Sequence, residues 1–233
     1  MLRSRVVQGA IEAAGALGLL AAACAAPDRV QHAAPSDRPA LASAPEPDAP
    51  RLAEIAAELR AMASADQALR ARLTALPEGP LGENATELLV ALVEADARHT
   101  ARLRAIVDEI GWPRVALVGR EAARDAWLLA QHADQDPELQ ARVLELILAG
   151  PEAAGVELRH VALLADRVQV SRGLPQRYGT QLVLRRAGER SVLEPSTPIE
   201  DPARLDERRR AMGLEPHEDY LERLRELYRI ERE

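Results

Sequence analysis

Large aliphatic residues recur every three or four positions through most of the chain, and this spacing is its strongest structural constraint. Within residues 51–76 the positions of this kind are Leu52, Ile55, Leu59, Met62, Leu69 and Leu73. The spacing places them on one face of an α-helix. Hydrophobic residues make up 47% of the chain, but aromatic residues only 2%, and Phe is absent. The core must therefore be built from aliphatic residues, and the abundance of Leu and Ala favours a mainly α fold.

Breaks in the pattern divide the chain into elements. Helices are predicted at about 51–76, 84–110, 120–133, 136–149, 152–166, 201–213 and 218–231. Asp136 and Pro137 have the residue types of an N-cap and a first helical position. Near residue 180 the period becomes an alternation, and "GTQLVLRRAGERSVLEP" predicts two short strands around residues 187–189. The expected architecture is one irregular helical domain over residues 51–233, with a small β-hairpin in its C-terminal half.

The first 24 residues have the features of an export signal. Arg3 and Arg5 precede an apolar run from Ala13 to Ala23, which is shorter than the about 20 residues that span a bilayer as a helix. The following Cys24, in "LLAAAC", resembles the lipidated cysteine of a bacterial lipoprotein, although the usual Leu three positions before it is Ala21. Cleavage at an Ala-x-Ala site and an uncleaved apolar helix of a cytoplasmic chain are the alternatives. We expect an exported protein, anchored in a membrane through Cys24 and facing the periplasm.

Residues 25–50 are rich in Ala, Pro, Ser and Asp and poor in large apolar side chains. Frequent Pro opposes helix formation, so this segment is expected to be a disordered tether. Such a tether behind a lipidated cysteine would hold the folded domain off a membrane surface.

Charge and motif content exclude several function classes. The net charge is −7, and Arg residues and aromatic residues do not interleave in a basic stripe, so nucleic-acid binding is not expected. The single Cys excludes an intramolecular disulfide. The sequence has no H-E-x-x-H, G-x-S-x-G, P-loop or G-x-G-x-x-G motif. No metal site and no cofactor are predicted.

The stretch "WLLAQHADQDPELQ", residues 127–140, contains the first cluster of candidate functional residues. On a regular helix Gln131 and Asp134 fall within roughly 60° of Trp127, so the three side chains could form one wall of a pocket. His132 shares the face of Leu128. It is either a half-buried, hydrogen-bonded structural residue or a general base with Asp134 nearby.

Two further clusters follow in the C-terminal half. The segment 166–181 brings together hydrogen-bonding side chains that fit either a buried structural loop or a ligand site: Asp166, Arg167, Gln176, Tyr178, Thr180 and Gln181. Three consecutive arginines occupy residues 208–210. Most such runs face solvent; alternatively Arg208 or Arg209 could bind an anion or form an internal ion pair.

Taken in order, "GWP", "VG", "AWLLAQHAD", "DRV", "PQRYGTQ", "PIEDPARLDERRRAMGL" and the region of Tyr220 resemble an uncharacterised bacterial domain family. The resemblance covers about residues 95–220. It implies that the candidate residues above occupy family-motif positions, and it supplies no activity.

Two functions fit these features. The first is an envelope-anchored module that binds a small polar ligand or an envelope protein. The second is a hydrolase-type enzyme, with His132 as general base, Asp134 or Asp166 orienting it, and Tyr178, Gln181 and an arginine binding the substrate.

Overall fold

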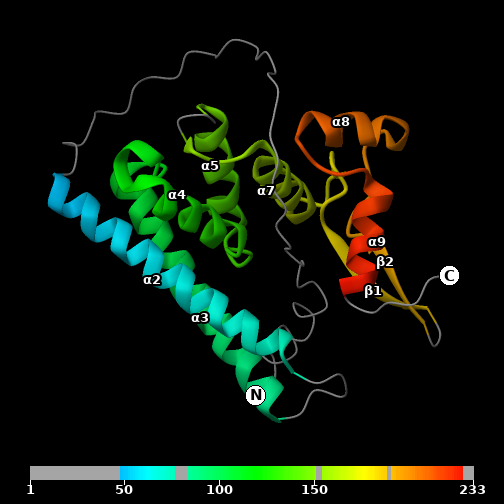
Figure 1. Ribbon diagram of the computed structural model, residues 1–233, viewed down its shortest axis with the longest axis horizontal. Coiled ribbons are helices and arrows are strands. Elements are labelled where there is room, and N and C mark those ends of the chain that lie inside the picture. The colour runs from blue at the N-terminus through cyan, green and yellow to red at the C-terminus, as the bar shows by residue number, and fades with distance from the viewer. Residues whose placement is uncertain (1–47, 77–82, 151–153, 188–189, 228–233) are drawn as a thin grey trace.

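The computed structural model describes residues 48–76, 83–150, 154–187 and 190–227 of the 233-residue chain (Figure 1). It confirms the mainly α fold with a small hairpin. The helices are α2 (Ala49–Thr74), α3 (Glu83–Ile110), α4 (Val115–Gln131), α5 (Pro137–Leu148), α7 (Leu158–Ser171), the short 3₁₀ helix η1 (Pro202–Arg204), α8 (Leu205–Ala211) and α9 (His217–Leu227). The strands are β1 (Leu182–Ala187) and β2 (Arg190–Pro195), paired antiparallel with Leu184 opposite Leu193.

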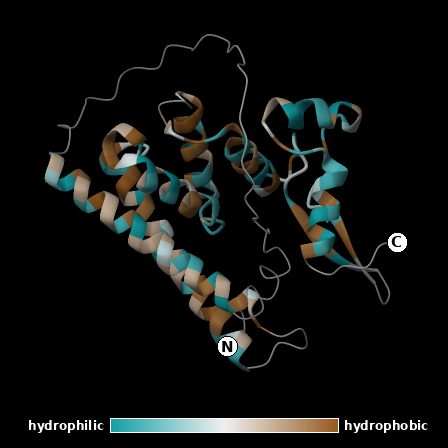
Figure 2. Ribbon diagram, viewed as in Figure 1, coloured by the Kyte–Doolittle hydropathy of each residue, from teal (hydrophilic) through white to brown (hydrophobic). Residues whose placement is uncertain are grey.

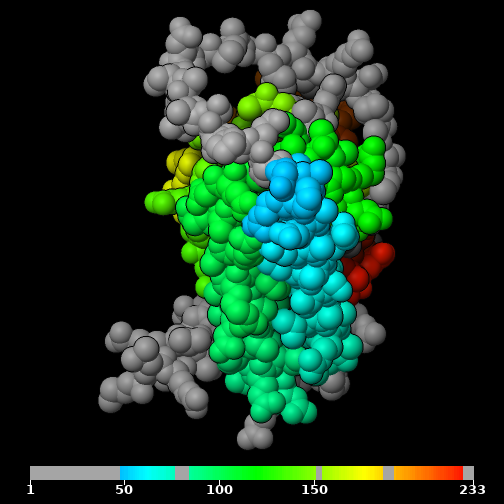
Figure 3. Space-filling view, turned by 90° about the vertical axis from the view of Figure 1, so that its left-hand side faces the viewer, coloured from blue at the N-terminus to red at the C-terminus, as the bar shows by residue number. Residues whose placement is uncertain are grey.

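The helices α2 to α7 form a helical layer around one apolar core. The two long helices α2 and α3 lie side by side, as Figure 3 shows from the left of Figure 1, and α4 packs against both of them. Ile55 and Leu59 of α2 meet Leu103 and Ile106 of α3 in this core, and all four are fully buried. On the other side, α5 and α7 pack against each other. The expected stripe of aliphatic residues is therefore the surface that holds the helices together.

Two helix boundaries differ from those predicted. α4 begins at Val115 rather than 120, but its backbone leaves the helical conformation at Gly119, where φ is 81°. The helix predicted at 152–166 corresponds in its later part to α7, which begins at Leu158 and continues to Ser171, while the predicted start lies outside the described residues. The chain is not helical just before α7, because Gly155 has φ +70° and Glu157 is extended, with φ −68° and ψ 146°.

Two other boundaries were anticipated correctly. The carboxylate of Asp136 accepts the backbone N–H of Leu139 at 3.0 Å, so Asp136 is the N-cap of α5 and Pro137 its first residue. The helix that starts after Asp201 opens with the 3₁₀ turn η1 and then continues as α8. Asp201 makes no side-chain cap hydrogen bond, so at this second start the matching local signal is Pro202 in the first helical turn.

The chain after α7 has a small core of its own. Leu193 of β2 packs with Tyr220, Leu221 and Leu224 of α9, and Leu182 of β1 lies against them. In Figure 2 the helices α8 and α9 of this region are largely hydrophilic, whereas the strands beside them are hydrophobic. Apolar burial alone is therefore a weaker organising force here than in the helical layer.

The predicted signal with Cys24 lies outside the described residues, as does nearly all of the predicted tether. Within the ranges that the structure describes, no helix combines the length and the apolar character needed to cross a membrane.

Candidate functional site

The buried stripe of α2 ends in a carboxylate. Ile55, Leu59, Ala63 and Asp66 are all buried and follow one another at three- or four-residue spacing. Asp66 thus occupies a position at which an apolar residue would continue the core, and its exposed fraction is 0%. A carboxylate in such a place must be paired, because an unpaired buried charge is strongly destabilising.

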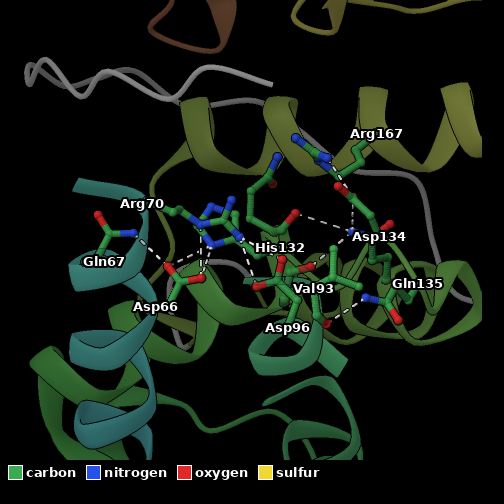
Figure 4. A network of polar contacts seen from close by, with 12 residues as sticks. Asp66, Gln67, Arg70, Val93, Asp96, His132, Asp134, Gln135 and Arg167 are labelled. Atoms are coloured by element: carbon green, nitrogen blue, oxygen red, sulfur yellow. Dashed lines mark hydrogen bonds and ion pairs between the residues drawn. The ribbon is translucent and has the colours of Figure 1, made fainter. Parts of the chain in front are cut away.

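His132 is one partner of Asp66. α4 ends at Gln131, and His132 is its C-cap. Both carboxylate oxygens of Asp66 lie 3.0 Å from the His132 Nδ1, as Figure 4 shows. The two residues come from elements 66 positions apart in the sequence. The helical core therefore builds a carboxylate–imidazole pair.

Arg70 extends the pair to a second carboxylate. Its Nε donates to Asp66 at 3.0 Å, and its Nη2 donates to both oxygens of Asp96 on α3 at 3.0 and 3.1 Å. Asp66 and Arg70 are one turn apart on α2, in the favourable order of acid before base. The result is a continuous chain of hydrogen bonds from His132 through Asp66 and Arg70 to Asp96 (Figure 4).

The two carboxylates of this network differ in their affinity for a proton. Burial acts to raise the pKa of Asp66, but the hydrogen bond with His132 and the charge of Arg70 outweigh it and lower that pKa to about 2. Burial dominates at Asp96 and raises its pKa to about 7, despite the charge of Arg70. Asp66 is therefore the permanent carboxylate of the network, and Asp96 is the one that titrates near neutral pH.

His132 is held as a neutral ring with one nitrogen to spare. Burial lowers its pKa below the usual value, and the charge of Arg70 acts in the same direction, although Asp66 opposes both. A neutral imidazole donates from one nitrogen only, and the acceptor at Nδ1 is a carboxylate. The proton therefore belongs on Nδ1. Among the described residues no hydrogen bond reaches Nε2, and 10% of the side chain is exposed to solvent.

The residues that were expected to form a pocket wall face α7 instead. Trp127 stacks on His160 of α7 with ring centroids 4.0 Å apart, and its Nε1 donates to the His160 carbonyl at 3.3 Å. Gln131, with its amide oxygen turned toward α7, accepts from the Arg167 Nε at 2.7 Å. The shared helical face was identified correctly, and its neighbour is a helix.

Asp134 belongs to the same contact and not to His132. Its Oδ1 accepts from the Arg167 Nη1 at 2.6 Å and from the Gln140 Nε2 at 3.2 Å. Gln140 also donates to the carbonyls of Ala130 and Gln131. The structure therefore places Asp66, and neither Asp134 nor Asp166, against the His132 ring. Whether His132 and Asp134 have catalytic roles stays a prediction.

Asp166 organises the segment "PQRYGTQ". Its fully buried carboxylate accepts the backbone N–H groups of Arg177, Tyr178 and Thr180 at 2.8, 3.1 and 2.9 Å, and the Thr180 hydroxyl at 3.0 Å. A single side chain thereby satisfies three backbone donors of a buried turn. Asp166 and Arg167 are adjacent on α7 but bind different parts of the chain. Asp166 binds the turn at residues 177–180, and Arg167 binds Asp134 after α4.

Gln176 and Gln181 complete this turn. The Gln181 N–H donates to the Gln176 side-chain oxygen at 2.7 Å, and the Gln176 Nε2 donates back to the Gln181 carbonyl at 2.9 Å. Gln181 also reaches the Leu163 carbonyl on α7 at 3.3 Å. In the part of the chain that the structure describes, no hydrogen bond or ion pair joins His132 to residues 176–181. The two halves of the hypothesised site are thus bound by different carboxylates: His132 by Asp66 and the Tyr178 backbone by Asp166.

Arg208 and Arg209 bind backbone carbonyls. Arg208 donates to the carbonyls of Arg177, Glu200 and Asp201. Arg209 is only 1% exposed and donates to those of Tyr178 and Glu215 at 2.6 and 2.7 Å. Both guanidinium groups thus fix the path of the chain through backbone carbonyls, an arrangement that the sequence did not indicate, and anion binding by Arg208 or Arg209 stays a prediction.

Sequence reasoning missed Asp66, Arg70 and Asp96. The available signal was an acidic residue within an aliphatic stripe, because Asp66 continues the spacing of Ile55 and Leu59. Within the described ranges, no group of three or more His, Cys, Asp or Glu side chains is arranged to hold a metal ion.

The comparisons agree with a domain that extends further toward the N-terminus than the resemblance suggested. A model of a family of unknown function, DUF6624, matches residues 53–232, so α2 with Asp66 and Arg70 lies inside the matched region. No curated protein and no solved structure gives a significant match. The matched region covers more than half of the chain, and the chain therefore belongs to the family of unknown function DUF6624.

Proposed function

We propose that this domain carries a hydrolase-type acid–base site in which His132 is the general base and Asp66 holds its ring. The single observation that supports this most is the arrangement of the imidazole. Both oxygens of a fully buried carboxylate lie 3.0 Å from Nδ1, and Nε2 has no hydrogen-bond partner among the described residues. General-base catalysis needs this arrangement of an oriented ring with one free lone pair.

The chemistry follows from the protonation states. With the proton on Nδ1, the lone pair of Nε2 accepts a proton from a water molecule as the water oxygen attacks an electrophilic carbon or phosphorus. The imidazolium that forms is stabilised by the Asp66 carboxylate. Burial lowers the pKa of His132, so the ring is neutral and competent as a base at pH 7.

A ligand-binding module without turnover is the second candidate. The observation that favours it is that His132 and Asp96 are 10% and 16% exposed at their side chains, so both can hydrogen-bond to a small polar molecule. The two candidates share one site and differ only in whether a bond is broken there.

We propose further that the domain is exported and anchored through Cys24. This rests on the charged and apolar N-terminal sequence that ends in "LLAAAC". A Cys24→Ala variant of the full-length chain should move from the membrane fraction to the soluble fraction of cells that process lipoproteins. Unchanged fractionation would contradict lipidation.

The test of the acid–base site uses the full-length chain and a panel of chromogenic esters, phosphate esters and amides. His132→Gln should lower kcat/KM on any substrate that is turned over by roughly 10²–10⁴-fold. Asp108→Asn is the matched control. Asp108 lies on α3, its side chain is 55% exposed, and it pairs with Arg142 outside the proposed site. Equal activity of His132→Gln and the control would refute the proposal. Binding of a panel compound that shifts the His132 ring signals without turnover would favour the second candidate.

A further inference from the structure

The network around Asp66 has two ends that reach solvent. Its middle member, Asp66, has an exposed fraction of 0%, whereas the side chains of His132 and Asp96 are 10% and 16% exposed. Three separate elements supply these groups, because Asp66 and Arg70 lie on α2, Asp96 on α3 and His132 after α4 (Figure 4). Three helices thus converge on one partly accessible polar cluster inside an otherwise aliphatic layer.

Arg70 makes the two ends depend on each other. One guanidinium group donates to Asp66 from Nε and to Asp96 from Nη2. A guanidinium stays protonated in proteins, so it passes no proton, but its charge is shared between the two carboxylates. The charge state of Asp96 therefore changes how much of the Arg70 charge is left to balance the Asp66 carboxylate. Because Asp66 contacts His132, this change alters the electrostatic environment of the His132 ring.

We propose that Asp96 is the second proton-exchanging group of this site, coupled electrostatically to His132 through Arg70 and Asp66. The charged groups that act on this pair are Asp66 and Arg70 on α2, Asp134 after α4 and Arg167 on α7. On α3, His99 is coupled to Asp66 and Arg70, and Arg98 lies beside it. Asp66, Asp134 and burial disfavour an ionised Asp96, while Arg70 favours it. The carboxyl group of Asp96 is consequently poised between its two states.

This role rests on the proposed function where catalysis is concerned. As water attacks, its proton goes to the Nε2 of His132, and its oxygen forms the new bond to the substrate. The bond to the leaving group breaks, and the leaving oxygen or nitrogen takes the proton of the Asp96 carboxyl group. The imidazolium and the Asp96 carboxylate then return to their starting states by proton exchange with solvent. A general base and a general acid of different strength are what such a hydrolysis requires.

The test is a pH titration of the full-length chain by NMR, with ¹³C at the Asp carboxyl carbons and ¹⁵N in the His rings. The Asp96 carboxyl signal should titrate near pH 7. The ring signals of His132 should show an inflection at the same pH, in addition to their own titration at lower pH. Asp96→Asn should abolish that inflection and keep the titration of the ring. Asp108→Asn, on the same helix and exposed, should leave both unchanged.

Two results would overturn the inference. One is an Asp96 signal that titrates near pH 4, as an exposed carboxyl group does. The other is a His132 inflection that persists in Asp96→Asn.

On a substrate from the panel, Asp96→Asn should lower kcat by roughly 10²-fold or more and remove the alkaline limb of the pH profile. If His132→Gln is inactive but Asp96→Asn keeps the wild-type rate and profile, Asp96 is not the acid and the proposed function stands. If His132→Gln is fully active, the proposed function fails, while the NMR titration still decides the coupling.

Discussion

The helical layer and the C-terminal segment use buried polar groups in different ways. The C-terminal segment is held by Asp166 at the end of α7 and by its own Gln176 and Arg209, which are all buried and bond to backbone groups of that segment. In the helical layer, Asp66 is equally buried, but its network ends at His132 and Asp96, which are partly exposed. The buried polar groups of the C-terminal segment fix the backbone path of a region that has only a small apolar core. The network of the helical layer leaves two titratable groups available, and such groups cluster at functional sites.

Asp166→Ala should produce the largest loss of stability if the C-terminal segment depends on its polar groups. The change leaves one buried and two partly buried backbone N–H groups without their acceptor, at a cost on the order of 3–5 kcal/mol in the free energy of unfolding. Urea denaturation measures this loss, and limited proteolysis should cut first within residues 174–216. Asp108→Ala removes only an exposed ion pair and should cost less than about 1 kcal/mol. Similar losses in the two variants would break the comparison.

Asp96→Asn should change how stability depends on pH. The pKa of Asp96 is raised from 3.8 to about 7 in the folded state, so the folded chain holds a proton that the unfolded chain has released. This contribution is fully present below pH 3.8 and is lost as the pH rises toward and through 7. The wild type should therefore lose on the order of 2–4 kcal/mol relative to Asp96→Asn between pH 4 and 8. Denaturation curves of both chains across that range give the difference directly, and parallel curves would contradict the raised pKa.

Gly179→Ala should have a smaller effect than these. Gly179 has φ +61°, and an added Cβ would lie 2.9 Å from the His217 Nε2 and 3.0 Å from the Ile199 Cδ1. Gly173 has a similar φ of +68° but open space around it. Gly173→Ala should cost about 1 kcal/mol from backbone strain alone, and Gly179→Ala about 2–3 kcal/mol. Equal melting temperatures for the two variants would show that the turn bound by Asp166 shifts to accommodate the added Cβ without loss of stability, which would contradict a rigid turn.

The same difference explains what the sequence could predict. Helices of the layer follow from aliphatic spacing, and the start of α5 follows from Asp136 and Pro137, because both signals are local. The hairpin follows from its alternation. The helix predicted at 152–166 ran across Gly155, whose φ of +70° interrupts it before α7 begins at Leu158, and this glycine was a local signal that the prediction did not use.

The candidate site could be predicted only in part. His132 was identified from its polar neighbourhood, but its partner Asp66 is 66 positions away, and no spacing rule links the two. The helical wheel put Trp127 and Gln131 on one face of α4, and Asp134, which lies in the turn after α4, reaches the same neighbour, yet a wheel does not say that α7 covers that face. Likewise, the sequence left open whether Arg208 and Arg209 bind an anion, since only the fold brings backbone carbonyls to them.

The most direct measurement of the central claim is the protonation pattern of the His132 ring in the full-length wild-type chain at pH 7, read from its ¹⁵N ring shifts. An imidazole held by Asp66 should be neutral, with the proton on Nδ1 and a free lone pair on Nε2. A ring protonated on Nε2, or on both nitrogens, has no lone pair at the accessible position. That result would contradict a general base at His132 and leave the pair with Asp66 as a structural contact of the helical core.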